Sequence, residues 1–138
     1  MSKYVTLLEK TFLIRTSYNF TKSIAKRIRL SKKGYAAHSC IPIAMLNYPF
    51  EILRIEGVDL GHLVETSIVG NLSETCFWRD MNYEVDVILK NKIPVEIKYQ
   101  NQISKSDFAS ILNFLDKFKL KKGILVTKNT MDVKFEKD

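Results

Sequence analysis

Two acidic residues and one lysine are the side chains best suited to chemistry in this sequence. Asp86 and Glu96 each lie within a short apolar run, and Lys98 follows Glu96 by two residues. A carboxylate in an apolar run needs a partner, because burying an unpaired charge costs much free energy. Lys98 could be one such partner and a divalent metal ion another. Asp86, Glu96 and Lys98 are therefore the first candidate site residues.

The residues around this set predict a β-hairpin. Apolar residues alternate along 83–90, which places Tyr83, Val85, Val87 and Leu89 on one face, and the alternation continues along 93–99. A two-residue turn at positions 91–92 would pair Asp86 with Ile97.

A three-residue loop, 90–92, instead pairs Asp86 with Glu96, and we expect this loop, with Asn91 in the left-handed conformation. The two carboxylates then face each other with Cβ atoms about 5 Å apart, which destabilises the sheet unless a cation or a proton intervenes.

Helices and strands must hold these residues in place. Asp59 is a probable N-cap for a helix whose apolar residues recur to Leu72, with Glu65 at the border of the buried face. A strand at 76–79 leads into the hairpin, and Ser104 caps a helix over 105–118. A buried strand follows at 123–127, with 131–135 as an edge addition. The helical crossover should set this strand parallel to the second hairpin strand.

The first 50 residues are harder to assign. We expect a helix over 2–10, strands at 12–15 and 23–30 around an irregular bend at 18–21, a short strand at 33–37, and a short helix at 41–47. Pro42 fits the first turn of that last helix.

The net charge of +7 is concentrated in this N-terminal part. Between residues 10 and 50 there are eight basic residues and no acidic residue, and the rest of the chain is nearly balanced. Two interpretations stay open, a solvated face or a surface that binds a polyanion such as DNA. The candidate nucleic-acid contacts are Lys22, Lys26, Arg27, Arg29, Lys32 and Lys33.

Glu65, Asp86 and the triplet Glu96-Ile97-Lys98, in this order of elements, resemble the PD-(D/E)XK nuclease superfamily over about residues 57–128. This superfamily includes restriction endonucleases and archaeal Holliday-junction resolvases. The resemblance implies a restriction-endonuclease-like α-β-β-β-α-β core with a mixed sheet. It also implies DNA hydrolysis with Mg²⁺ or Mn²⁺. Asp86, Glu96 and Glu65 would be the metal ligands, and Lys98 would orient the attacking water or stabilise developing charge.

A second resemblance covers nearly the whole chain. Several segments are similar to the uncharacterised C-terminal domain of prokaryotic AAA-type ATPases. They are residues 4–14, 26–28, 32–35, 77–80 and 84–86, together with Gly61 and Glu65. The resemblance implies a basic N-terminal segment, residues 1–56, that begins inside the end of a winged-helix segment, followed by a nuclease-like core at 57–138. It also implies an ATPase domain, in cis or in trans, as a partner.

The composition of the chain predicts its class and its surroundings in the cell. We expect a soluble, cytoplasmic domain without a membrane span, because no apolar run approaches the roughly 20 residues that a transmembrane helix needs. The two cysteines provide no disulfide framework. Three functions stay open: a nuclease-fold domain that binds and cleaves DNA, a non-catalytic module that recognises nucleic acid or protein, and an assembly element. A homodimer is compatible with each.

Overall fold

The computed structural model describes residues 3–47, 60–73 and 76–129, which form a mixed α/β fold. The N-terminal part contains α1 (Lys3–Lys10), β1 (Ile14–Asn19), α2 (Ile24–Arg29), β2 (Lys32–Ala36) and α3 (Cys40–Met45). After the undescribed residues 48–59 follow α4 (Gly61–Asn71), β3 (Cys76–Asp80), β4 (Tyr83–Val85), β5 (Val87–Ile88) and β6 (Pro94–Lys98). The 3₁₀ helix η2 (Lys105–Phe108), α5 (Ala109–Phe118) and β7 (Ile124–Thr127) complete the described chain.

The strands form two mixed sheets. The first has the order β2-β1-β3-β4 and the second the order β5-β6-β7. β1 runs antiparallel to β2 and parallel to β3, so strands from before and after residue 57 share the first sheet. β6 and β7 are parallel, which confirms the expected crossover through α5.

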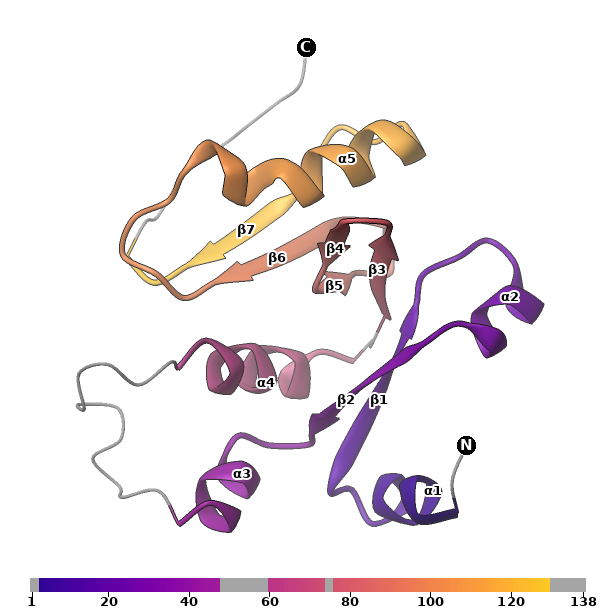
Figure 1. Ribbon diagram of the computed structural model, residues 1–138, viewed down its shortest axis with the longest axis vertical. Coiled ribbons are helices and arrows are strands. Elements are labelled where there is room, and N and C mark those ends of the chain that lie inside the picture. Colours follow the sequence, from indigo (N-terminus) through magenta and orange to yellow (C-terminus); the bar gives the residue numbers. More distant parts are fainter. Residues whose placement is uncertain (1–2, 48–59, 74–75, 130–138) are drawn as a thin grey trace.

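Helices cover the second sheet on both sides (Figure 1). Val69 of α4 packs with Val87 and Val95 in one buried cluster, while Phe114 of α5 packs with Trp78 and Val85 in another. The apolar stripe predicted for the helix over 105–118 thus faces the sheet, and its first turn is the 3₁₀ helix η2. Ser104 begins it as expected, because its backbone N–H donates to Asp107 Oδ2 at 2.7 Å.

Asp86 stands at the junction of the two sheets. It is the one residue between β4 and β5, at the point where the chain leaves the first sheet for the second. Val85 and Ile88 belong to the cluster on the α5 side, whereas Val87 and Leu89 belong to the cluster on the α4 side. The expectation that Val85 and Val87 share a face is therefore wrong, because the alternation is interrupted where the strand changes its partner.

Other differences from the sequence-based expectations lie in the N-terminal part. The segment 23–30 was expected to be a strand but contains α2, whose N-cap Ser23 accepts a hydrogen bond from Lys26 N–H at 3.3 Å. Ile24 and Ile28 are four residues apart and share a helix face, a spacing that suits a helix as well as a strand. β1 extends to Asn19 through part of the expected bend, because it pairs with both β2 and β3.

The remaining expectations are mostly confirmed. Helices lie at α1 and α3, and strands at β2 and β3. Among the described strands β7 lies at the edge of its sheet, and it is not fully buried as expected, since Ile124 is 43% exposed. Asp59 and residues 131–135 lie outside the described residues.

Candidate functional site

The hairpin of β5 and β6 ends just before Asp86. Val87 pairs with Val95 and Ile88 with Pro94, and continuing this register by one residue would set Asp86 opposite Glu96. The Leu89 N–H donates to Ile93 O at 3.0 Å, which closes the three-residue loop 90–92. The predicted three-residue loop is thus confirmed, while the pairing of Asp86 with Glu96 stays a prediction. The left-handed residue of the loop is Lys92, with φ of 62°, and not Asn91.

Glu96 is a buried acid with an incomplete set of partners. The residue is 5% exposed, and its Oε1 atom lies 3.0 Å from Lys98 Nζ. The second oxygen, Oε2, is buried and has no hydrogen-bond partner. Burial and the negative charge of Asp86 raise the pKa of Glu96 to about 7, although Lys98 acts in the opposite direction. The site thus holds a carboxyl group that a further cation or a proton would stabilise.

The Asp86 side chain reaches across to β6, the strand that carries Glu96. Its Oδ2 atom accepts a hydrogen bond from the Ile97 N–H at 2.9 Å, directly beside Glu96. Burial and the nearby charge of Glu65 raise the pKa of Asp86, despite this hydrogen bond. Burial lowers the pKa of Lys98, but its hydrogen bond to Glu96 and the charges of Glu96 and Asp86 outweigh that effect and raise it. Asp86, Glu96 and Lys98 therefore act on one another electrostatically.

Three carboxylates lie around the ammonium group of Lys33 on β2. Its Nζ atom is 3.7 Å from Glu65 Oε1 and 3.8 Å from Asp86 Oδ1, and it forms an ion pair with Glu84 Oε1. We call Glu65, Glu84 and Asp86, gathered around Lys33, the acid cluster. A residue predicted to contact nucleic acid thus lies inside the candidate site, where it is the cation that links Glu65 with Asp86.

Glu84 was not among the residues singled out from the sequence. It forms ion pairs with Lys33 and with Arg79 of the neighbouring strand. Burial raises the pKa of Glu84, but the hydrogen bonds from Arg79 and Lys33 outweigh burial and lower it. The signal was present, because Glu84 precedes Asp86 by two residues on one predicted strand.

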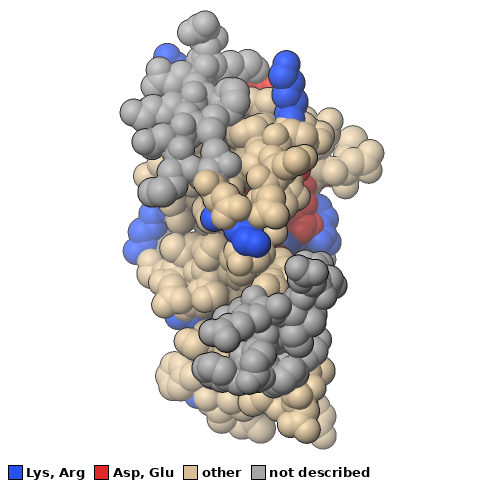
Figure 2. Space-filling view, turned by 90° about the vertical axis from the view of Figure 1, so that its left-hand side faces the viewer, with Lys and Arg blue, Asp and Glu red and all other residues tan. Residues whose placement is uncertain are grey.

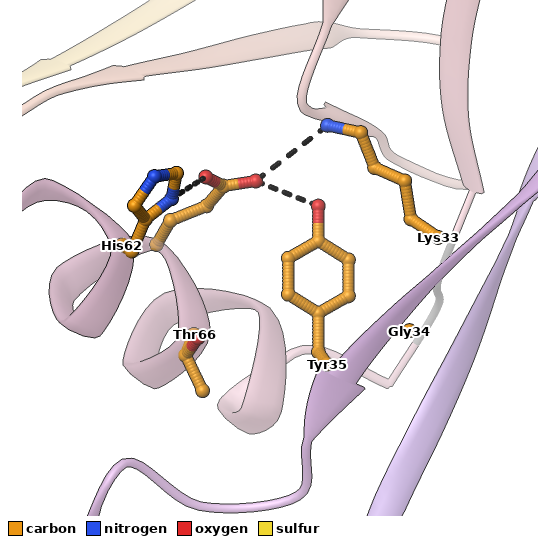
Figure 3. A pocket seen from close by; sticks show the side chains of 6 residues that line it. Lys33, Gly34, Tyr35, His62 and Thr66 are labelled. Atoms are coloured by element: carbon orange, nitrogen blue, oxygen red, sulfur yellow. Dashed lines mark hydrogen bonds and ion pairs between the residues drawn. The ribbon is translucent and has the colours of Figure 1, made fainter. Parts of the chain in front are cut away.

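A pocket of about 370 Å³ opens beside Glu65 (Figure 3). The Tyr35 hydroxyl donates to Glu65 Oε1 at 2.6 Å, and His62 Nδ1 lies 3.9 Å from Glu65 Oε2. Figure 3 shows Lys33 and Tyr35 approaching the same oxygen of Glu65 while His62 approaches the other. Burial and the hydrogen bond to Glu65 raise the pKa of Tyr35 above its usual range, so the phenol stays protonated as a donor.

A hard divalent cation such as Mg²⁺ requires oxygen ligands, which the carboxylates of the site could supply. Within residues 3–47, 60–73 and 76–129, no three His, Cys, Asp or Glu side chains are grouped as a ready metal site. Glu65, Asp86 and Glu96 are thus not assembled as three ligands. Mg²⁺ often takes only one or two carboxylates and completes its shell with waters and substrate oxygens. Asp86 and Glu96 fit that pattern, because Asp86 bonds to the backbone N–H of the residue after Glu96 and Glu96 keeps an unpaired buried oxygen.

The other basic candidates lie on the surface. Lys22, Lys26, Arg27, Arg29 and Lys32 are all exposed. Arg27 and Lys32 approach the Tyr18 ring at 5.1 and 5.2 Å. Arg15 has a different role, because its guanidinium donates to Leu72 O at 2.6 Å, beyond the C-terminus of α4. On the face drawn in Figure 2, lysine and arginine side chains lie at separate places rather than in one continuous patch.

Comparison with known proteins gives one match. The model of a family described as a domain of unknown function, DUF4143, matches residues 56–138. Domains of this family are found in proteins associated with AAA-type ATPases. No curated protein and no solved structure matches the chain. In the described part of the chain, no helix is both long and apolar enough to cross a membrane.

Proposed function

The chain belongs to the DUF4143 family, and we propose that it is a DNA-binding domain with a metal-dependent phosphodiesterase site at Asp86, Glu96 and Lys98. The observation that carries the proposal is the closeness of two buried carboxylates: Asp86 bonds to the Ile97 N–H next to Glu96, and Glu96 has one oxygen on Lys98 and the other buried without a partner. Two like charges at this position weaken the fold of the metal-free protein. Their arrangement is better explained by a ligand than by stability.

Each residue of the site would have a separate role in hydrolysis. Asp86 and Glu96 would hold a Mg²⁺ or Mn²⁺ ion, which when bound neutralises phosphate charge and makes a bound water nucleophilic near neutral pH. Lys98 keeps its proton, since its pKa is raised, and supplies a positive charge beside the reacting phosphate. Glu65, held by Tyr35 and Lys33, is positioned to hydrogen-bond a water on the Asp86 side.

DNA is the proposed polymer because exposed cations lie on α2 and on β2, the strand that also reaches the site. α2 and the start of β2 carry Lys26, Arg27, Arg29 and Lys32, and β2 also supplies Lys33 to the acid cluster. Phosphates bound along these residues would release counterions, so the affinity should fall with rising salt. The occurrence of the family in ATPase-associated proteins supports a further proposal, that an AAA-type ATPase domain in cis or in trans is a partner.

A cleavage assay tests the proposal directly. Duplex, branched and single-stranded DNA would be incubated with the protein in Mg²⁺, Mn²⁺ or EDTA. We expect metal-dependent cleavage by the wild type, its loss in Asp86→Asn and Lys98→Met, and its retention in Asp116→Asn, which changes an exposed carboxylate of α5. Cleavage that persists in Asp86→Asn, or no cleavage of any substrate with either metal, would refute the catalytic part.

One observation favours a second function, a non-catalytic recognition module. Lys33 already supplies a cation to Glu65, Glu84 and Asp86. A permanent ion-pair network would need no metal and would simply fix β2 against α4 and β4. DNA binding without cleavage, and without any effect of Mn²⁺ on stability, would support this function.

A further inference from the structure

A second pocket, distinct from the one beside Glu65, lies between the α2 region, β3 and the end of α5. It measures about 360 Å³, near the lower end of the range for small-molecule pockets. The aromatic side chains of Phe20, Trp78 and Phe118 line it, together with Lys22, Lys26 and Lys117. The residues used in the proposed hydrolysis do not line it.

The apolar part of the pocket is a fixed aromatic cluster. The Phe20 and Phe118 rings meet edge to face with centroids 5.4 Å apart, and the Trp78 and Phe118 rings do so at 6.2 Å. Trp78 is only 3% exposed and Lys117 Nζ lies 5.5 Å from the centre of its ring, so it backs the pocket, and the accessible ring surface belongs to the half-buried Phe20 and Phe118. A flat apolar group entering the pocket would contact ring surface that is already held in place.

The rim of the pocket carries uncompensated positive charge. Lys117 forms an ion pair with Asp80, and Arg79 forms one with Glu84. Lys22 and Lys26 are exposed and, within the described residues, take part in no ion pair. Two free ammonium groups beside an aromatic wall suit a ligand that combines an anion with a flat ring. A nucleotide is such a ligand.

We propose that this pocket binds one unpaired nucleotide of a DNA strand, with the base against the aromatic wall and the phosphate at Lys22 and Lys26. A base inside a duplex is stacked on both sides and cannot offer its face to the wall, so the nucleotide must be unpaired. The proposal rests on the proposed DNA-binding function and specifies its substrate as DNA with an unpaired nucleotide.

The pocket is also connected with the acid cluster. Arg79 lines the pocket and pairs with Glu84, which in turn pairs with Lys33. The pocket and the acid cluster are therefore joined through two adjacent residues of β3, Trp78 and Arg79, whose side chains leave the strand on opposite faces. This placement suits a substrate such as a bulge, a flap or a branch point.

The first experiment observes the pocket itself. Trp78 is the single tryptophan of the chain, so its indole N–H gives one assignable signal in a ¹H–¹⁵N NMR spectrum. We expect thymidine 5′-monophosphate to shift this signal in a saturable way, and thymidine or inorganic phosphate alone to shift it much less. Lys22→Glu with Lys26→Glu should weaken the effect, whereas Lys121→Glu with Lys122→Glu, an equal charge change outside the pocket, should preserve it.

The second experiment compares three duplexes by fluorescence anisotropy: one with a single bulged thymidine, one with an abasic bulge, and one without a bulge. We expect the duplex with the bulged thymidine to bind about tenfold more tightly than the duplex with the abasic bulge. A tenfold difference corresponds to about 1.4 kcal/mol, which is within the range by which stacking on an aromatic side chain stabilises a bound base.

Each outcome bears on a different part of the proposal. Equal, salt-dependent binding of all three duplexes would overturn the pocket proposal and leave DNA binding intact. An indole shift with the nucleotide but no binding of any DNA would overturn both the DNA assignment and the proposed function. An unmoved indole signal together with equal binding of the two bulges would show that the pocket holds no nucleotide.

Discussion

Glu96 contributes a pH-dependent term to the stability of the folded protein. Its pKa is raised to about 7, mainly because burial disfavours the charged form, whereas in the unfolded chain it returns to its ordinary value near 4.5. The folded state therefore binds more protons than the unfolded state between these two values. The stabilisation from a protonated Glu96 is fully present below about pH 4.5 and is lost as the pH rises through about 7.

This pH dependence is testable with Glu96→Gln. For the wild type, the free energy of unfolding should fall by up to roughly 3 kcal/mol between about pH 4.5 and pH 7.5 because of this group. The variant should show a flatter profile and be more stable than the wild type at the upper end. Urea unfolding across this range measures both. An unchanged slope in Glu96→Gln would assign the effect to other groups.

Site residues were predictable where a local rule applied. The three-residue loop 90–92 was predictable from the short spacing between the two hairpin strands, and Lys98 from its spacing to Glu96. Lys33 and Tyr35 were not predictable as parts of the site, because they enter it from β2, about 50 residues earlier in the sequence than Asp86. No local pattern reports such a contact.

At the scale of elements, the packing of α4 against the end of β2 positions Glu65. Gly70 of α4 lies so close to the chain after β2 that an added Cβ would be 2.8 Å from the backbone oxygen of Ala37. A backbone atom cannot move aside as a side-chain tip can. Arg15 secures the same end of α4 through Leu72 O.

Gly70→Ala should therefore destabilise the protein. Alanine gains about 1 kcal/mol over glycine in a helix interior, but overpacking against backbone typically costs about 1–3 kcal/mol. We expect a net loss, measured as a lower free energy of unfolding. Gly34→Ala is the matched control, since nothing lies within 4 Å of the added Cβ there, and it should change stability little. A Gly70→Ala variant as stable as the wild type would mean that α4 is not fixed by this contact.

The elements themselves were predictable to different degrees. The helix over 105–118 has a capping residue and a wide apolar stripe, and both survive in the fold. The strand expected around Ile24 is a helix, because an apolar spacing of four residues suits both structures and Ser23 caps the helix. The exchange of partners at Asp86 could not be foreseen, because alternation describes one continuous strand.

At the scale of the whole molecule, the charge distribution would set how the proposed DNA ligand is bound. Arg27 and Arg29 are exposed on α2 and belong to the segment that carries the net positive charge. Each phosphate contact that is lost should weaken binding to all sequences and lower the salt dependence by about one counterion.

Arg27→Glu with Arg29→Glu should accordingly weaken DNA binding and reduce the slope of log affinity against log salt by about 2. Anisotropy titrations at several salt concentrations measure the slope. The Lys121→Glu and Lys122→Glu pair again serves as the charge-matched control. Equal affinity and slope in both double variants would place the DNA on another surface.

The central claim is that Asp86 and Glu96 form a divalent-cation site, and thermal unfolding of wild type and Asp86→Asn, each in EDTA and in excess Mn²⁺, tests it most directly. Because the pKa of Asp86 is raised, its charge costs stability in the folded protein, so Asp86→Asn should be more stable than the wild type in EDTA, by up to about 1 kcal/mol. Mn²⁺ should raise the Tm of the wild type by mass action and leave that of the variant unchanged. A destabilised variant, together with a wild type that does not respond to Mn²⁺, would contradict the claim and make the acid cluster a structural ion network.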